Sequence, residues 1–152
     1  MHYIDEQLNN VESKISKHLV DDVIIAIKIC DIKFKKGRIS SIREKIHSEL
    51  MNNGWSPEVH IDPSSRISIT SLKEGVGLCI QTGNMGRMYA DLLKLQSMYK
   101  KKIISCAIFI VPMKKAAKSM GDNLVNYERL VNEIKIFADV ITLPIIVFGF
   151  YE

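Results

Sequence analysis

Residues 103–111 have the sequence Ile-Ile-Ser-Cys-Ala-Ile-Phe-Ile-Val, and Pro112 follows them. An apolar run of this length, without alternating polar positions, is typical of a strand that is buried on both faces of a sheet. Residues 141–150 form a second run of the same character. Buried strands that are separated by helical segments predict a sheet covered by helices on both sides. The fold class that we expect is therefore α/β, with a mixed central sheet sandwiched by helices.

The segments around these two strands have the patterns of a hairpin and two helices. Residues 66–72 and 76–81 are short β-like runs, and the glycine-containing turn 73–75 between them predicts an antiparallel hairpin. Apolar residues at helical spacing follow in two sets, the second after a cap at Asn123: Met88, Leu92, Leu95 and Tyr99, then Leu124, Leu130 or Val131, Ile134 and Phe137. We expect residues 76–81, 103–111 and 141–148 to be neighbouring strands of one sheet.

The first 54 residues are predicted to be mainly helical. A helix is expected at the start, because five apolar residues recur there at helical spacing: Ile4, Leu8, Val11, Ile15 and Leu19. Residues 22–34 are ambiguous, and their β-branched content favours a strand. Residues 41–53 predict a helix, with Ser41 and Glu44 as a capping box and Asn52-Asn53-Gly54 as the stop signal.

Composition places the chain among ordinary globular proteins. It has 152 residues, of which 47% are hydrophobic and 25% charged, and no linker-like or repeated segment divides it. We expect one domain over residues 1–152, with a helical part over about 1–54 and a core over about 55–152. Three widely spaced cysteines argue against a disulfide framework and favour the reducing cytoplasm. No apolar run approaches the length of a membrane span, so no membrane association is expected.

Residues 70–149 carry a series of short motifs in a recognisable order. Thr70 is followed after eight residues by Cys79, within the run Val-Gly-Leu-Cys-Ile-Gln over residues 76–81, and Tyr89 and Asp91 come next. The downstream runs Ile-Val-Pro-Met-Lys at 110–114 and Pro-Ile-Ile-Val-Phe-Gly at 144–149 continue the series. This order resembles the BglII and BamHI type of restriction endonuclease, within the PD-(D/E)XK nuclease superfamily. The pattern of that family is an Asp, eight residues that end in Val-Gly-Leu, and then Glu-X-Gln.

The resemblance implies a restriction-endonuclease-like fold, action on double-stranded DNA in restriction or defence, and a homodimer. In that family the Asp and Glu carboxylates hold Mg²⁺, and here the matching active-site positions are Thr70, Cys79 and Gln81. The first two lack the anionic oxygens that Mg²⁺ prefers. We therefore expect impaired cleavage, with Mg²⁺ as the cofactor if the protein is active and no cofactor otherwise. The alternative is a non-catalytic module that binds DNA or another protein.

Strand geometry places Cys79 and Gln81 on one face of the segment 76–81, as the lining of a cleft would require. The alternative interpretation is that Cys79 is a small buried apolar residue and that Gln81 caps the helix that follows. If the metal site has migrated, Glu58 and Asp62 are the candidate ligands, because they alternate with His60 on one face of a short strand. Such charged residues are more typical of the solvated face of an edge strand.

One polar stripe is a candidate DNA-binding surface. Asn84, Arg87 and Lys94, together with Asp91, recur at helical spacing from a helix N-terminus, where phosphate binding is favoured. The same stripe fits an internal ladder of salt bridges equally well. Lys114 is a further candidate, because it lies in the segment that leads toward the DNA-recognition region in the resembling family. The net charge of +4 is compatible with a polyanionic partner but does not by itself indicate one.

Overall fold

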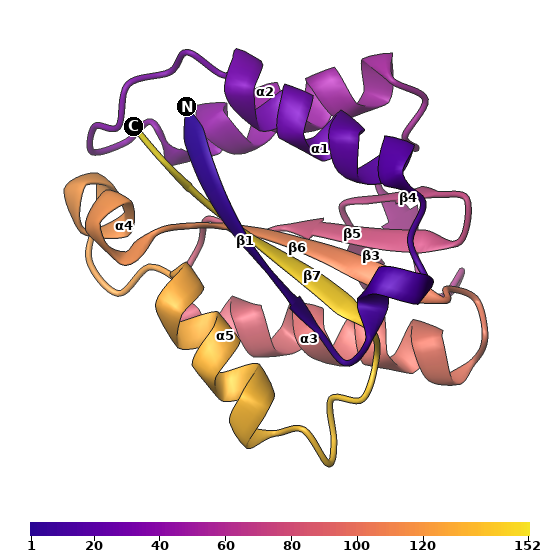
Figure 1. Ribbon diagram of the computed structural model, residues 1–152. Helices are drawn as coiled ribbons and strands as arrows, with labels where there is room; N and C mark the ends of the chain where they lie inside the picture. Colours follow the sequence, from indigo (N-terminus) through magenta and orange to yellow (C-terminus); the bar gives the residue numbers. More distant parts are fainter.

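The computed structural model describes all 152 residues. A five-stranded sheet with the strand order β1-β7-β6-β5-β4 lies between two layers of helices (Figure 1). The strands of this sheet are β1 (His2–Leu8), β4 (Ser71–Lys73), β5 (Val76–Ile80), β6 (Cys106–Pro112) and β7 (Ile145–Tyr151). The helices are α1 (Lys17–Ile29), α2 (Ile39–Asn52), α3 (Met85–Lys100), α4 (Lys114–Met120) and α5 (Tyr127–Ile136), with a short 3-10 helix at Val11–Ser13. The expected α/β fold is confirmed.

The three central strands are neighbours, as the sequence predicts, and the structure shows that they run parallel. β6 pairs with β5 on one side and with β7 on the other, and every residue of β5 and β6 is buried. Strand β6 begins at Cys106 and not at Ile103, where the apolar run in the sequence begins. Ile103 is 47% exposed. Lys102 just before it adopts a left-handed backbone conformation with φ 59°. The predicted helix between β5 and β6 is α3, whose Met88, Leu92 and Leu95 are buried.

The predicted hairpin is present, but its first arm is divided. β4 pairs with β5 in antiparallel orientation, and Glu74 and Gly75 form the turn with positive φ angles. The chain leaves this ladder at Thr70, so that β3 (Ser68–Ile69) pairs with β2 (Val59–His60) in a separate two-stranded sheet. The carboxyl end of β5 therefore has no strand partner on the side of β4.

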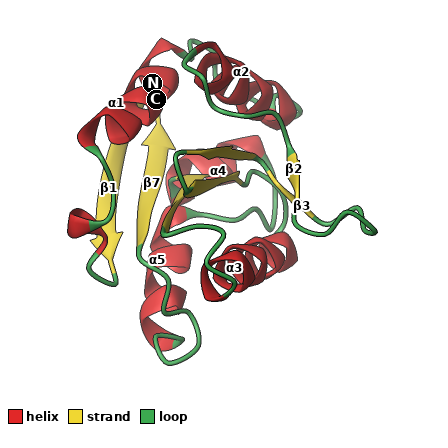
Figure 2. Ribbon diagram, turned by 90° about the vertical axis from the view of Figure 1, so that its right-hand side faces the viewer, coloured by secondary structure: helices red, strands yellow, loops and turns green.

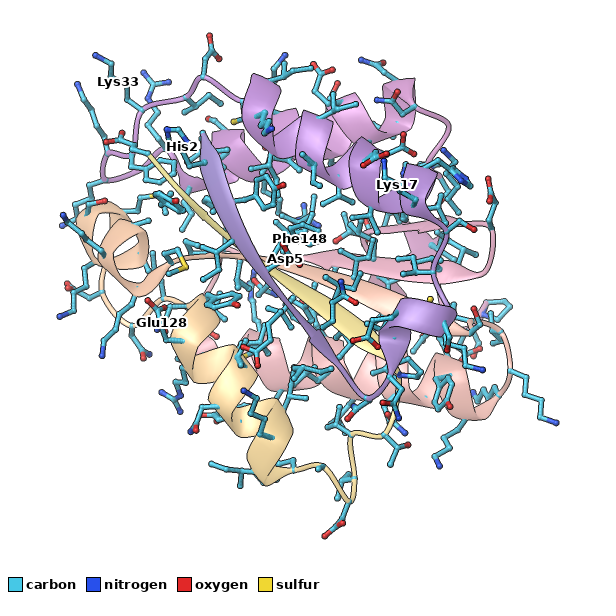
Figure 3. The ribbon with its side chains drawn as sticks, viewed as in Figure 1. His2, Asp5, Lys17, Lys33, Glu128 and Phe148 are labelled. Atoms are coloured by element: carbon cyan, nitrogen blue, oxygen red, sulfur yellow. The ribbon has the colours of Figure 1, made fainter.

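The expectation for the start of the chain is wrong. Residues 2–8 form β1, which runs antiparallel to β7 with Asp5 opposite Phe148 (Figure 3). Ile4 and Leu8 fit a helical stripe locally, yet pairing along the otherwise open edge of β7 satisfies a row of backbone groups, and tertiary pairing overrides the local pattern. Residues 22–34, for which a strand was favoured, contain most of α1 instead. Its buried residues Leu19, Val23, Ala26 and Ile27 lie on one helical face.

Two other helices begin at positions that differ from the expectation. α2 starts at Ile39, before the expected capping box, and no side chain caps it. α5 starts after Asn126, whose side chain accepts the N–H of Arg129, whereas Asn123 has a left-handed backbone conformation before it. Helix α4 was not predicted, and Phe137 lies just beyond α5, exposed rather than inward.

The two faces of the sheet bury two separate apolar clusters. Val76, Leu78 and Ile80 pack against α1 and α2, while Cys79 packs on the other face against α3 and α5. Figure 1 shows these helix pairs above and below the sheet. Asp22 of α1 also accepts hydrogen bonds from Trp55 Nε1 and Lys73 Nζ. Since Lys73 belongs to β4, the second bond fixes α1 to the edge of the sheet. None of the helices combines the length and the apolar character that crossing a membrane requires.

Candidate functional site

A pocket of about 560 Å³ lies at the carboxyl end of β5. Helices α2 and α3, which cover opposite faces of the sheet, both reach it, and Figure 2 shows them with β2 and β3 on this side. Its polar lining consists of Ser40, Arg43, Glu58, Ser68, Thr70, Gln81, Thr82, Arg87, Asp91 and Lys94. The carboxyl ends of strands in α/β sheets are the usual position of ligand sites, so this pocket is the candidate site.

Two side chains form hydrogen bonds with the backbone at the carboxyl end of β5. Gln81 N–H bonds to the carbonyl of Ile110 on β6, so the N–H and C=O of Ile80 point to the opposite side, where the outer strand has turned away. Thr70 Oγ1 accepts the Ile80 N–H at 3.0 Å, and Arg43 Nε donates to the Ile80 carbonyl at 3.2 Å. Thr70 and Arg43 thus satisfy backbone groups that would otherwise be buried without partners.

Gln81 is held at both ends of its amide. Its Oε1 accepts the Gly83 N–H at 2.8 Å, and its Nε2 donates to Asp91 Oδ2 at 2.5 Å. The amide therefore fixes the loop before α3. This role is similar to the predicted one, in which Gln81 caps the helix. The N-cap itself is Asn84, whose side chain accepts the Arg87 N–H.

Cys79 does not reach the pocket. Its side chain is 1% exposed and packs among apolar residues of the α3 and α5 layer. Burial, with a smaller contribution from the charge of Asp91, raises the pKa of the Cys79 thiol far above its usual range. The thiol therefore remains neutral, and the structure favours the interpretation of Cys79 as a small buried apolar residue.

The polar stripe of α3 divides into two parts. Asp91, which is 7% exposed, forms a salt bridge of 2.8 Å with Lys94, as the ladder interpretation predicts. Arg87 is exposed, forms no salt bridge, and lines the same pocket. Asn84 is committed to capping. The stripe thus contains an internal ion pair and one cation that remains available to an external anion.

Lys114 lies apart from this pocket. It is the first residue of α4 and lines a second hollow together with Lys118 and Arg129. Its backbone N–H donates to the carboxylate of Glu128, a residue labelled in Figure 3. The structure therefore brings Arg87 and Lys94 together but not Lys114.

The residues of the pocket do not fit a Mg²⁺ ion. Thr70 and Gln81 use their oxygen atoms in hydrogen bonds, and the charge of Asp91 is balanced by Lys94. Glu58 lines the pocket but accepts a hydrogen bond from the Ser68 hydroxyl. No cluster of three histidine, cysteine or acidic side chains in the molecule could hold a metal ion.

The migrated site built on Glu58 and Asp62 is not formed. Only Val59 and His60 are in β2, so the two carboxylates do not project from one strand. Asp62 lies in the following turn, where the N–H and hydroxyl of Ser64 hold the pKa of its carboxyl below the usual value. Asp62 is therefore a turn residue, and Glu58 alone reaches the pocket.

Arg43 is the site residue that sequence reasoning missed. It follows Ile39 by four residues and precedes Ile46 and Leu50 by three and seven, so it falls on the inward face of a correctly predicted helix. A charged residue at the margin of an otherwise apolar helical face was the available signal.

The sheet order, the two helical layers and a polar pocket at the end of the hairpin define a restriction-endonuclease-like α/β protein. The sequence model of the restriction endonuclease BglII/BglIII family matches residues 4–150, and the chain belongs to this family. The structure is similar to restriction endonuclease BglII complexed with a DNA 16-mer, with a TM-score of 0.89 and 15% identity over 100% of this chain and 79% of that chain. The similarity to free BglII has a TM-score of 0.78 and 16% identity over 100% and 80% of the two chains. No curated protein matches the sequence.

Proposed function

We propose that this member of the BglII/BglIII family binds duplex DNA in restriction or defence and that its capacity to cleave DNA is impaired. One observation carries the proposal. The two positions that correspond to the metal-binding carboxylates of the resembling nucleases hold Thr70, which bonds to the Ile80 backbone, and Cys79, whose thiol is buried. Neither side chain offers Mg²⁺ an anionic oxygen.

DNA is the favoured partner because of the family and of the charge around the pocket. The similar BglII structure contains a DNA 16-mer, and the pocket of this chain has three cationic side chains, those of Arg43, Arg87 and Lys94. Phosphate contacts from such residues supply most of the affinity of non-specific DNA binding. The homodimer that the resemblance implies and the cytoplasmic location that the three spaced cysteines favour belong to the same proposal.

A cleavage assay and a binding assay test the two parts separately. Purified protein incubated with supercoiled plasmid and Mg²⁺ is expected to leave the plasmid intact. Fluorescence anisotropy with a labelled duplex of mixed sequence is expected to show binding that weakens steeply between low and physiological salt. Binding that is absent at every salt concentration contradicts the proposal and favours a protein-interaction module.

A nuclease that cleaves DNA despite the poor fit of this pocket to Mg²⁺ is the second candidate, because the family is one of restriction endonucleases and Glu58 is a pocket carboxylate without a salt-bridge partner. The same plasmid assay decides between the two. Cleavage by the unmodified protein that disappears in Glu58→Gln establishes the second candidate and rejects the first.

A further inference from the structure

The guanidinium of Arg43 is anchored in the pocket at one nitrogen only. Its Nε donates to the Ile80 carbonyl, while Nη1 and Nη2 have no hydrogen-bond partner and no carboxylate forms a salt bridge with the group. A guanidinium presents its donors as a rigid planar fork that matches two oxygens of a phosphate. The free side of the fork is therefore available to a ligand.

The balance of charge makes the pocket attractive to an anion. Its lining has three cationic side chains and only two carboxylates, those of Glu58 and Asp91. Asp91 is already paired with Lys94, so Arg43 and Arg87 are the cations without a carboxylate partner. Two unpaired guanidinium groups on opposite helical layers face one cavity.

Gly83 contributes to the position of Arg87. A Cβ at Gly83 would lie 2.9 Å from Gln81 Oε1 and 3.1 Å from Arg87 Cδ. The missing side chain therefore allows the stem of Arg87 to lie close against the loop that Gln81 holds. Gly83 therefore leaves room for Arg87 in the position from which it lines the pocket.

We propose that the Arg43 guanidinium takes the place of the divalent cation in this pocket and, together with Arg87, binds a phosphate group of the DNA backbone without metal. The inference rests on the proposed function and specifies how the same site recognises its ligand. A guanidinium neutralises a phosphate but cannot coordinate and activate a water molecule as Mg²⁺ does. Retained binding without hydrolysis follows from this exchange of one cation for another.

The first test compares binding with and without metal. Anisotropy of a fluorescein-labelled duplex of mixed sequence is measured in EDTA and in Mg²⁺ at matched ionic strength. The dissociation constants are expected to agree within about twofold, because the cation in the site is part of the protein. Binding that requires Mg²⁺ overturns this inference and leaves the proposed DNA binding intact, whereas no binding under either condition overturns the proposed function.

The second test replaces the guanidinium. Arg43→Gln is expected to weaken binding about tenfold or more, because one phosphate contact is lost. For the same reason, the slope of log K against the logarithm of the salt concentration is expected to become shallower by about 0.9. Arg43→Lys keeps the charge without the fork and is expected to be intermediate. Arg129→Gln is the control, since it removes the same charge from α5, where Glu133 already pairs with the guanidinium. Binding by a folded Arg43→Gln that equals the unmodified protein overturns the inference.

Folding of each variant is verified by circular dichroism, because Arg43 also satisfies the Ile80 carbonyl. If Arg43→Gln does not fold, Arg43→Lys decides: unchanged affinity overturns the inference, and a loss that EDTA and Mg²⁺ do not alter supports it. Calorimetric titration with inorganic phosphate separates the DNA backbone from a free anion. Phosphate binding that depends on Arg43, while duplex binding does not, assigns the site to a free anion and overturns the assignment to DNA.

Discussion

Restoring the two carboxylates should create a metal site where the protein has none. The double variant Thr70→Asp/Cys79→Glu places acidic groups at the positions that the proposal matches to the metal ligands of such nucleases. At Thr70 the exchange is conservative in shape, because a carboxylate oxygen can still accept the Ile80 N–H that Thr70 Oγ1 accepts at 3.0 Å. At Cys79 it is not, because that side chain is buried among apolar residues.

The expected cost can be worked from this burial. A longer side chain in the packed cluster around Cys79 costs about 1–3 kcal/mol, and a buried charge without a partner costs about 3–5 kcal/mol. The metal-free variant should therefore lose roughly half of a typical stability of about 5–15 kcal/mol. Mg²⁺ at about 100 times its Kd should return about 2.7 kcal/mol. For a chain of this size that corresponds to a rise in Tm of roughly 5–10 °C.

Thermal unfolding with and without Mg²⁺ measures this rise independently of activity. The unmodified protein and the neutral control Thr70→Asn/Cys79→Gln should show no rise beyond the effect of ionic strength. Plasmid nicking by the charged double variant should be detectable but weak, since Arg43 would compete with Mg²⁺ for the new carboxylates, and adding Arg43→Gln should increase it. A Mg²⁺-dependent rise in the Tm of the unmodified protein, or robust cleavage by it, would refute the reasoning.

Four further outcomes are expected. Arg87→Ala should weaken duplex binding and lower the salt slope by about 0.9, measured by anisotropy over a salt series. Asp22→Asn should reduce the free energy of unfolding in urea by about 1–3 kcal/mol, because the hydrogen bonds from Trp55 and Lys73 lose their charged acceptor. Gly149→Ala should destabilise by about 1–3 kcal/mol or more, because its Cβ would lie 2.6 Å from Met113 Sδ and 2.7 Å from the Tyr127 ring, whereas the control Gly121→Ala meets Leu124 at 3.4 Å and should be tolerated. Burial raises the pKa of Tyr127 to about 12, so the contribution of Tyr127 to stability should be complete below about pH 10 and fall as pH rises toward 12. In a series of melts, Tyr127→Phe should therefore make the loss of stability over this pH range less steep.

The central sheet could be predicted because its signals are local and consistent. The apolar run before Pro112, the turn at Glu74 and Gly75, and the period of α3 each indicate one structure, and the three agree with one another. The β1 strand could not be predicted in this way. Its spacing at Ile4 and Leu8 fits a helix, and only the open edge of β7, over a hundred residues away, determines that the segment is extended.

The part of the candidate site that follows from alternation along one strand could be predicted. The part that depends on how the helical layers pack against the sheet could not. Alternation along β5 correctly separated Cys79 and Gln81 from Leu78 and Ile80. The alternation could not show that Cys79 is buried outside the pocket while Gln81 lines the pocket. Arg43 comes from another layer of the fold, and no spacing along the chain relates it to Gln81.

The proposed loss of two carboxylates and the presence of Arg43 are physically coupled. With Thr70 and Cys79, the pocket has three cationic and two anionic side chains, so it carries one net positive charge. A carboxylate at Thr70 would cancel that charge, and a second one that reached the pocket from Cys79 would reverse it. The Thr70 carboxylate would accept hydrogen bonds from Arg43, which bonds to the same residue as Thr70, Ile80, and would occupy its free donors. A pocket with those carboxylates therefore needs an external cation to receive a phosphate, whereas this pocket receives one unaided. On this argument the single variant Thr70→Asp should weaken duplex binding in EDTA, and a gain in affinity would contradict it.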